Sequence, residues 1–211
     1  MGASDDLRAA LSADRLMAIV RYRNGGDLAG AVDALCAGGV RVVEITMNSA
    51  GAWTERVDVP DGVLLGAGTV TTTDEVRQVA ELGARFVVSP GFDPAVVAAA
   101  AEAGLAAIPG ISTATEVLAA RRAGVEFFKL FPAGALGVRY LSELRGPFAE
   151  EAFVVTGGIT VDDIGPWLAA GAFAVALGSN LCGAEAPSSS PDAAALTQRA
   201  RAAVNAAREH A

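Results

Sequence analysis

The chain has 211 residues, of which 24 are acidic and 16 are lysine or arginine, so its formal net charge is −8 and its isoelectric point lies near 4.7. This balance excludes a general nucleic-acid or anionic-membrane binder, because either would need a basic face. With 52% hydrophobic residues, the chain suits one domain, residues 1–211, around a large core. No apolar stretch has the length of a membrane span and the first residues lack a signal-peptide pattern, so we expect a soluble, cytoplasmic protein.

Short apolar segments alternate with helix-like segments along the whole chain. A helix is expected within residues 1–15, where Ser4 is a candidate cap followed by two acids. Eight strands are expected at 16–21, 40–46, 63–65, 85–88, 105–108, 125–131, 153–155 and 173–177. Helices are expected at 27–37, 50–57, 73–82, 93–103, 113–123 and 161–170, with the region 136–144 between the sixth and seventh strands and a last helix from 192 to about 208. Residues 184–191, rich in Ser, Pro and Ala, are expected to form a loop.

The strands are continuously apolar, which is typical of a parallel sheet covered by helices on both faces. Strict alternation of strand and helix indicates an α/β fold, and eight such units close most economically as a (β/α)8 TIM barrel with a short N-terminal helix. An open doubly wound sheet is the alternative, but no Gly-x-Gly-x-x-Gly turn follows the first strand to support a dinucleotide fold. Barrels gather their active sites at the carboxyl ends of the strands, so we look there for function.

Lys129 is the only lysine of the chain, against fifteen arginines, and it lies inside the apolar sixth strand. A composition that otherwise avoids lysine indicates that this position needs an amine rather than a charge. Arginine cannot lose its proton in a protein or condense with a ketone, whereas a desolvated lysine amine can form a Schiff base. Phe127 and Phe131 share its face of the strand and should flank the amine. The alternative is an ordinary surface or snorkelling lysine.

Glu44, in the second strand, is the acid expected to meet this amine. By the alternation of side chains it faces the same way as Val42 and Thr46. If that face is the inner one, its carboxylate would meet Lys129 across the barrel lumen. The alternative is a structural ion pair of Glu44 with Lys129 or an arginine. Because such pairing raises the pKa of a lysine, burial has to outweigh it if Lys129 is to react as a neutral amine.

Two glycine-containing turns follow the last two strands, Thr156-Gly157-Gly158-Ile159 and Leu177-Gly178-Ser179-Asn180. Barrels commonly bind phosphate at these two places through backbone N–H groups, and glycine lets the backbone approach an anion closely. Such a site would hold an anion in an acidic protein without any basic patch. Gly-Gly after a strand is otherwise only a turn signal, and its pairing with Gly178-Ser179 favours the phosphate site.

Six segments at the strand ends carry a resemblance: Val43-Glu44-Ile45-Thr46, Gly66-Ala67-Gly68-Thr69-Val70, Ser89-Pro90-Gly91, Ile108-Pro109-Gly110, Phe128-Lys129-Leu130-Phe131-Pro132-Ala133 and Thr156-Gly157-Gly158-Ile159. Together they resemble the 2-keto-3-deoxy-6-phosphogluconate (KDPG) / 4-hydroxy-2-oxoglutarate aldolase family over about residues 16–183. The resemblance implies a class I lyase on a trimeric (β/α)8 barrel, without a cofactor. Such an enzyme splits a 2-keto-3-deoxy sugar acid phosphate into pyruvate and glyceraldehyde 3-phosphate.

The resemblance also implies roles for particular residues. Lys129 matches the Schiff-base lysine, and Glu44 matches the acid/base that moves protons through water. The substrate-binding residues it implies are Arg21 and Thr69 at the pyruvate carboxylate and Pro90 and Phe131 around the imine, with Thr156 beside them. The phosphate-binding residues are Gly157, Gly158, Gly178 and Ser179.

Asn48 departs from the family pattern. Many KDPG aldolases have an arginine that binds the pyruvate carboxylate two residues after the second-strand threonine, where this chain has Asn48. Arginine clamps a carboxylate with two charge-assisted bonds, whereas asparagine offers a weaker, neutral donor. Asn-Ser at this place is similar to sister enzymes that act on the galactonate epimer, in which the counterpart of Arg21 holds the carboxylate. The expected substrate is 2-keto-3-deoxy-6-phosphogluconate, with the 6-phosphogalactonate epimer and 4-hydroxy-2-oxoglutarate as alternatives.

Other classes of function remain as alternatives. A phosphosugar isomerase or epimerase barrel, with Lys129 serving only as a charge, predicts activity that survives Lys129→Arg. A sugar-phosphate sensor would need an effector segment, and none is visible. A zinc-dependent aldolase is disfavoured because zinc sites of that class use several imidazoles and the only histidine is His210, the penultimate residue. Cys36 and Cys182 lack metal or redox spacing and are expected to be reduced thiols, so no metal is expected.

Overall fold

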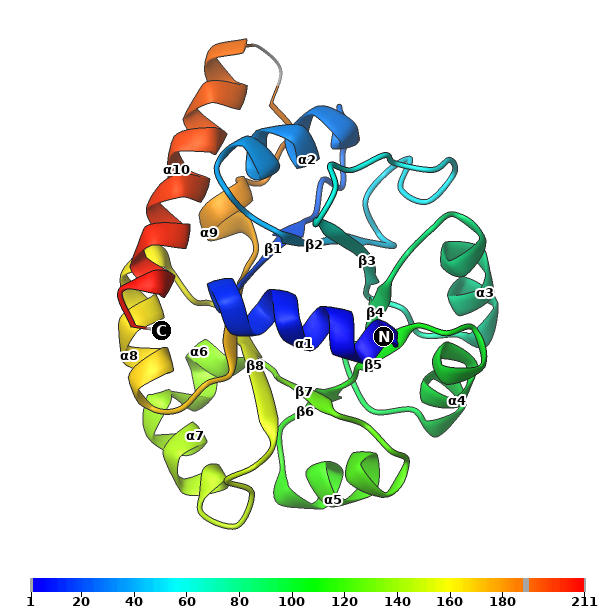
Figure 1. The fold of residues 1–211 in the computed structure, drawn as a ribbon, viewed down its shortest axis with the longest axis vertical. Helices are drawn as coiled ribbons and strands as arrows, with labels where there is room; N and C mark the ends of the chain where they lie inside the picture. The colour runs from blue at the N-terminus through cyan, green and yellow to red at the C-terminus, as the bar shows by residue number, and fades with distance from the viewer. Residues whose placement is uncertain (1, 188–189, 211) are drawn as a thin grey trace.

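The computed structural model describes residues 2–187 and 190–210 and shows a ring of strands surrounded by helices (Figure 1). The strands are β1 (Leu16–Val20), β2 (Val42–Thr46), β3 (Leu64–Gly68), β4 (Phe86–Val88), β5 (Ala106–Ile108), β6 (Gly110–Ile111), β7 (Phe127–Leu130), β8 (Ala152–Thr156) and β9 (Ala174–Leu177). The helices are α1 (Ala3–Asp14), α2 (Leu28–Ala37), α3 (Thr73–Glu81), α4 (Pro94–Glu102), α5 (Ala114–Arg122), α6 (Ala133–Leu136), α7 (Val138–Arg145), α8 (Ile164–Ala169), α9 (Ser179–Cys182) and α10 (Ser190–Arg208), with a 3-10 turn at Val161–Asp163.

Neighbouring strands are parallel throughout and follow the order β5-β4-β3-β2-β1-β9-β8-β7-β6. The two ends of this order, β5 and β6, are pieces of one strand interrupted at Pro109, so the sheet curves round into a nearly closed barrel. Proline has no N–H to donate, but the Pro109 carbonyl still accepts a hydrogen bond from the Lys129 N–H at 2.9 Å. The predicted (β/α)8 barrel is confirmed, and its fifth strand extends past 105–108 to Ile111.

The helix expected at 50–57 is wrong, and these residues form turns. Gly51 (φ 77°) and Trp53 (φ 56°) adopt left-handed backbone conformations, which a right-handed helix cannot contain. The indole N–H of Trp53 donates to the carbonyl of Ile45 at 3.0 Å, so the turn packs its largest side chain against the end of β2.

The ends of the chain need two smaller corrections. The first helix begins at Ala3, ahead of the expected cap Ser4, and the Asp5 carboxylate accepts from the N–H of Gly2 at 3.0 Å. The loop expected at 184–191 is shorter, because α10 begins at Ser190, and residues 188–189 of that stretch lie outside the described residues. The short helix α9 has no counterpart among the predicted elements.

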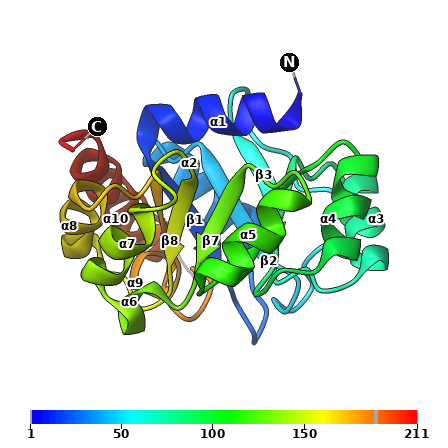
Figure 2. The ribbon, with the colours of Figure 1, turned by 90° about the horizontal axis from the view of Figure 1, so that it is seen from below.

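Alternate side chains of the strands fill the barrel lumen, and the others pack against the surrounding helices. The inward apolar side chains are Met17, Ile19, Val42, Phe86, Val88, Ala106, Ile108, Phe127, Ala152, Val154, Ala174 and Ala176. Leu7 and Leu11 of α1 belong to the same cluster, and Figure 2 shows α1 lying across one end of the strands. Because α1 leads directly into β1, it covers the amino end of the barrel. The carboxyl end is the side left for a site.

Asp14, at the end of α1, holds this covering helix in place. Its buried carboxylate accepts hydrogen bonds from Arg41, which lies just before β2, and from Arg208 of α10. The shorter of the two bonds from Arg208 measures 2.8 Å. Burial alone would raise the pKa of Asp14, but the hydrogen bonds and charges of the two arginines outweigh it and hold the pKa below its usual value. The first helix, the second strand and the last helix are therefore joined at one point.

Candidate active site

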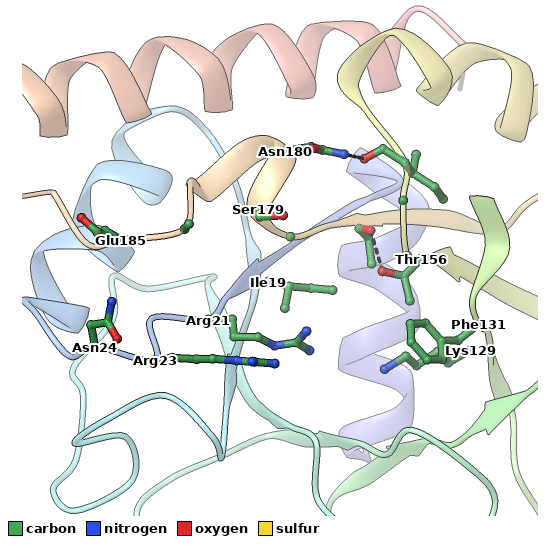
Figure 3. A pocket seen from close by; sticks show the side chains of 16 residues that line it. Ile19, Arg21, Arg23, Asn24, Lys129, Phe131, Thr156, Ser179, Asn180 and Glu185 are labelled. Atoms are coloured by element: carbon green, nitrogen blue, oxygen red, sulfur yellow. Dashed lines mark hydrogen bonds between the residues drawn. The ribbon is translucent and has the colours of Figure 1, made fainter. Parts of the chain in front are cut away.

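A pocket of about 460 Å³ opens at the carboxyl ends of β1, β7, β8 and β9. Its lining holds eight of the twelve predicted site residues: Arg21, Lys129, Phe131, Thr156, Gly157, Gly158, Gly178 and Ser179. Figure 3 shows Arg21, Lys129, Phe131 and Thr156 around the inner part of the pocket. The structure therefore brings together the expected nucleophile and the expected phosphate turns, which lie 27 to 51 residues after it in the sequence.

Lys129 lies at the floor of this pocket with only 5% of its surface exposed. Because side chains alternate along β7, Lys129 points into the barrel with Phe127, while Phe128 and Leu130 face the helices. Its Nζ lies 5.0 Å from the centre of the Phe131 ring, so this aromatic contact is present as expected, whereas Phe127 lies deeper in the lumen. Burial lowers the pKa of the Lys129 amine, and nearby Arg21 lowers it further against the opposing effect of Glu44. The structure thus favours the neutral, nucleophilic form of the amine.

Glu44 is buried in the lumen beside Lys129, with 1% of its surface exposed. Its Oε1 has no hydrogen-bond partner, and among the described residues neither Glu44 nor Lys129 takes part in an ion pair. The structural ion pair considered as an alternative is therefore absent from the described part of the chain. Burial raises the pKa of Glu44, although the charges of Lys129 and Arg21 partly offset the rise. A raised pKa suits a carboxyl group that takes up and returns a proton during a reaction.

Glycine in β3 makes room for this carboxyl group. A Cβ built on Gly68 would lie 1.6 Å from Oε1 of Glu44, and one on Gly66 would lie 2.4 Å from the Phe86 ring. No other residue fits at 68 while Glu44 keeps its position. A small space of about 10 Å³ remains in the lumen, lined by Glu44, Lys129 and Thr156 among others. This is about the size that holds one water molecule, which would connect the acid and the amine.

The two predicted phosphate turns lie side by side and are tied to each other. Thr156 donates through Oγ1 to the carbonyl of Ala176 at 2.8 Å, and Asn180 donates through Nδ2 to the carbonyl of Ile159 at 2.9 Å. Gly157 (φ 95°) has a left-handed backbone, and a Cβ there would lie 2.9 Å from the Phe131 ring. The backbone of these turns therefore faces the pocket without side chains that would block an anion.

Asn48, Thr69 and Pro90 do not line the pocket. Asn48 is exposed, and it is the next residue, Ser49, that is buried and accepts from the N–H of Tyr22 at 3.1 Å. Thr69 sits directly after β3 with a left-handed backbone (φ 60°), an uncommon conformation for a β-branched residue. Pro90 is exposed after β4. Their expected contacts with substrate stay predictions.

The pocket also holds residues that the sequence did not single out. Arg23 and Asn24 follow Arg21 in the loop after β1, and Asn180 and Glu185 follow β9. The signal for Arg23 was present in the sequence, because continuing the alternation of β1 past its end places residues 19, 21 and 23 on one side. No comparable pattern marks Glu185.

Comparison with known proteins gives the family. The family model described as "KDPG and KHG aldolase" matches residues 7–198. The chain belongs to this family. The 2-dehydro-3-deoxy-phosphogluconate aldolase of Treponema pallidum is 39% identical over 165 residues, which cover 76% of this chain and 78% of that protein. The 2-dehydro-3-deoxy-6-phosphogalactonate aldolase of Escherichia coli (strain K12) is 32% identical over 197 residues, 90% of this chain and 96% of that one.

Solved structures agree with this KDPG and KHG aldolase assignment. A structure described as "Native KDPGal structure" superposes with a TM-score of 0.81 at 31% identity, covering 92% of this chain and 95% of that one. A KDPG aldolase from Legionella pneumophila, with pyruvate captured as a covalent carbinolamine intermediate, has a TM-score of 0.73 at 27% identity over 96% of each chain. The chain is thus an aldolase, a carbon–carbon lyase, and not an isomerase or epimerase.

Among the described residues, no helix has the length and apolarity of a membrane span.

Proposed function

We propose that this KDPG-family protein is a class I aldolase that cleaves 2-keto-3-deoxy-6-phosphogluconate to pyruvate and glyceraldehyde 3-phosphate. The observation that carries the proposal is Lys129, the one lysine of the chain, buried at the pocket floor with a lowered pKa beside the unpaired carboxyl group of Glu44. The carbinolamine captured in the Legionella relative is the adduct that a lysine amine forms with pyruvate, and it supports the same chemistry here.

The reaction begins when the neutral amine of Lys129 attacks the C2 ketone. The resulting carbinolamine loses water and becomes a protonated imine, whose nitrogen can accept electrons from the neighbouring carbon. Glu44, acting through a water in the small space that it shares with Lys129, exchanges the protons of these steps. The low exposure of both residues keeps bulk water from competing for the protons.

Carbon–carbon cleavage follows from the imine. A base removes the proton of the C4 hydroxyl, the C3–C4 bond breaks, and its electron pair moves into the imine to give an enamine, while C4 becomes the aldehyde carbon. The enamine is then protonated at C3, and water releases pyruvate and the free amine. Glu44 interacts electrostatically with Lys129 and lines the same small space, so we assign both proton transfers to it.

The two ends of the substrate carry negative charge, and the pocket offers partners for both. Arg21 lies near enough to Lys129 to affect the pKa of the amine, which suits a guanidinium that holds the C1 carboxylate. The turns with Gly157-Gly158 and Gly178-Ser179 offer backbone N–H groups for the phosphate. The trimer implied by the resemblance stays a prediction.

Borohydride reduction in the presence of pyruvate tests the Schiff base. Reduction should add the mass of the reduced pyruvate adduct to the protein, and peptide mapping should place it on Lys129. The same treatment without pyruvate is the control. A folded protein that gains no adduct would contradict the proposal.

The substrate epimer is tested by retro-aldol assays on the gluconate and galactonate compounds and on 4-hydroxy-2-oxoglutarate. The gluconate epimer is expected to give the highest kcat/KM, since the relatives named for it are 39–41% identical to this chain and those named for the galactonate epimer 32–36%. The Asn48-Ser49 pair favours the galactonate epimer as a second candidate.

Asn48→Arg, assayed beside the wild type, separates carboxylate binding from epimer choice. Asn48 lies outside the pocket lining, so the expected effect depends on the greater length of an arginine side chain. The carboxylate is common to both epimers, so a guanidinium that reaches it is expected to lower KM for both by about 3- to 10-fold without changing their ranking. If the variant instead changed which epimer is preferred, residue 48 would contribute to recognition of the C4 configuration, contrary to this expectation.

A further inference from the structure

We propose that Arg23 recognises the distal anionic group of the substrate, the phosphate in the proposed reaction, and so decides between phosphorylated and unphosphorylated aldehydes. The inference rests on the proposed function, because it takes Lys129 as the point at which the ketone is held. It concerns a side chain of the loop after β1 that lies outside the segments resembling the family.

The backbone after β1 directs Arg23 into the pocket. Ile19, Arg21 and Arg23 all line the pocket, whereas Tyr22, between the two arginines, is fully buried. The Tyr22 hydroxyl donates to the carbonyl of Cys182 at 3.0 Å and fixes the chain on that side. Figure 3 shows the guanidinium groups of Arg21 and Arg23 both extending toward the side of the pocket that holds Lys129.

Arg23 is available to a ligand. Among the described residues, no carboxylate lies within ion-pair distance of Arg21 or Arg23, whereas eight other arginines are paired. Apart from the amine of Lys129, the described lining of the pocket contains two cations, Arg21 and Arg23, and one acid, Glu185. A cationic pocket in a protein of net charge −8 indicates that these charges are there for an anionic ligand.

The positions of the cations match the two ends of the substrate. The C1 carboxylate is bonded to the ketone carbon that Lys129 attacks, so its partner has to be close to Lys129, as Arg21 is. The C6 phosphate lies four carbons further along and needs a partner further out. Arg23 is two residues beyond Arg21, in a loop whose Gly26 packs so closely on Ala186 that an added Cβ would lie 2.4 Å from the Ala186 Cβ. This contact holds the loop against the segment that follows α9.

The test runs the reaction in the condensation direction, with pyruvate and either D-glyceraldehyde 3-phosphate or D-glyceraldehyde. The two aldehydes differ only in the phosphate. Arg23→Ala is expected to raise KM for the phosphorylated aldehyde roughly 10- to 100-fold, the usual effect of losing a hydrogen bond between charged groups, and to change KM for glyceraldehyde less than about twofold. Arg23→Lys should recover part of the loss, since an ammonium binds phosphate as a point charge.

Arg201→Ala, which removes one exposed arginine of α10, is the matched control and should leave both aldehydes unaffected. Borohydride trapping of pyruvate is measured on every variant and should proceed in Arg23→Ala as in the wild type. Equal losses for both aldehydes, or slower trapping in Arg23→Ala, would assign Arg23 to the carboxylate or to the fold and overturn the inference. Wild-type protein that traps no pyruvate would instead overturn the proposed function.

Discussion

Lys129→Arg is expected to abolish aldol cleavage and the covalent trapping of pyruvate. Arginine keeps the positive charge, but its guanidinium stays protonated and does not condense with a ketone. Without an imine the C3–C4 bond has no electron sink, so kcat should fall on the order of 10⁴-fold or more. Retro-aldol kinetics and the mass of the borohydride-treated protein measure the two effects.

The site of Lys129 demands a control for folding, because an arginine has to fit where only 5% of the lysine surface is exposed. Lys129→Met keeps the apolar contacts of the side chain without its charge and should be equally inactive. Circular dichroism and thermal unfolding would show that both variants are folded. Cleavage that persists in folded Lys129→Arg would mean that the residue acts only through its charge, contrary to the Schiff-base role.

Glu44→Gln is expected to lower kcat by about 10²- to 10⁴-fold, the usual range for loss of a general acid/base. The amide has the shape of the carboxyl group and fits beside Gly68, but it cannot take up or return a proton. The adduct with pyruvate should still form on prolonged incubation, because Lys129 is intact. This outcome distinguishes Glu44→Gln from Lys129→Arg in one trapping experiment.

The pH profile gives a second measurement on Glu44→Gln. Imine formation needs the neutral amine, so the trapping rate falls as pH falls through the pKa of Lys129, which burial holds below the ordinary lysine value. The charge of Glu44 raises that pKa, so its removal should move the acid limb to lower pH. Glu81→Gln, an exposed acid at the end of α3, is the control and should shift neither limb nor kcat. An unshifted limb in Glu44→Gln would mean that the two groups do not interact.

The barrel was predictable because its signals are local. Each strand is a short apolar run and most helices end at glycine, so counting the repeats was sufficient for the architecture. Lys129 and Glu44 were found by composition and parity, and the structure places both inward as expected. The helix expected at 50–57 failed because the left-handed backbone of Trp53 depends on where its indole packs, which no local pattern encodes.

The remaining parts of the site depend on contacts between distant segments. Gly68 reads as an ordinary turn glycine until the position of Glu44 shows what the missing Cβ makes room for. The alternation that groups Arg23 with Ile19 and Arg21 is visible in the sequence, but only the burial of Tyr22 shows that it continues beyond the end of β1. Asn48 could be recognised as unusual from the sequence, but its exposed position outside the pocket could not.

The covering of the barrel's amino end by α1 bears on the order in which molecules come and go. With that end closed, substrate and products share the one mouth at the carboxyl end. In the proposed reaction the pyruvate half stays attached to Lys129 at the bottom of the pocket while the aldehyde half lies above it. We therefore expect the aldehyde to leave first and, in condensation, pyruvate to enter first. Steady-state kinetics should therefore follow an ordered mechanism, in which substrates bind and products leave in a fixed order. Product-inhibition patterns of a random mechanism would contradict this expectation.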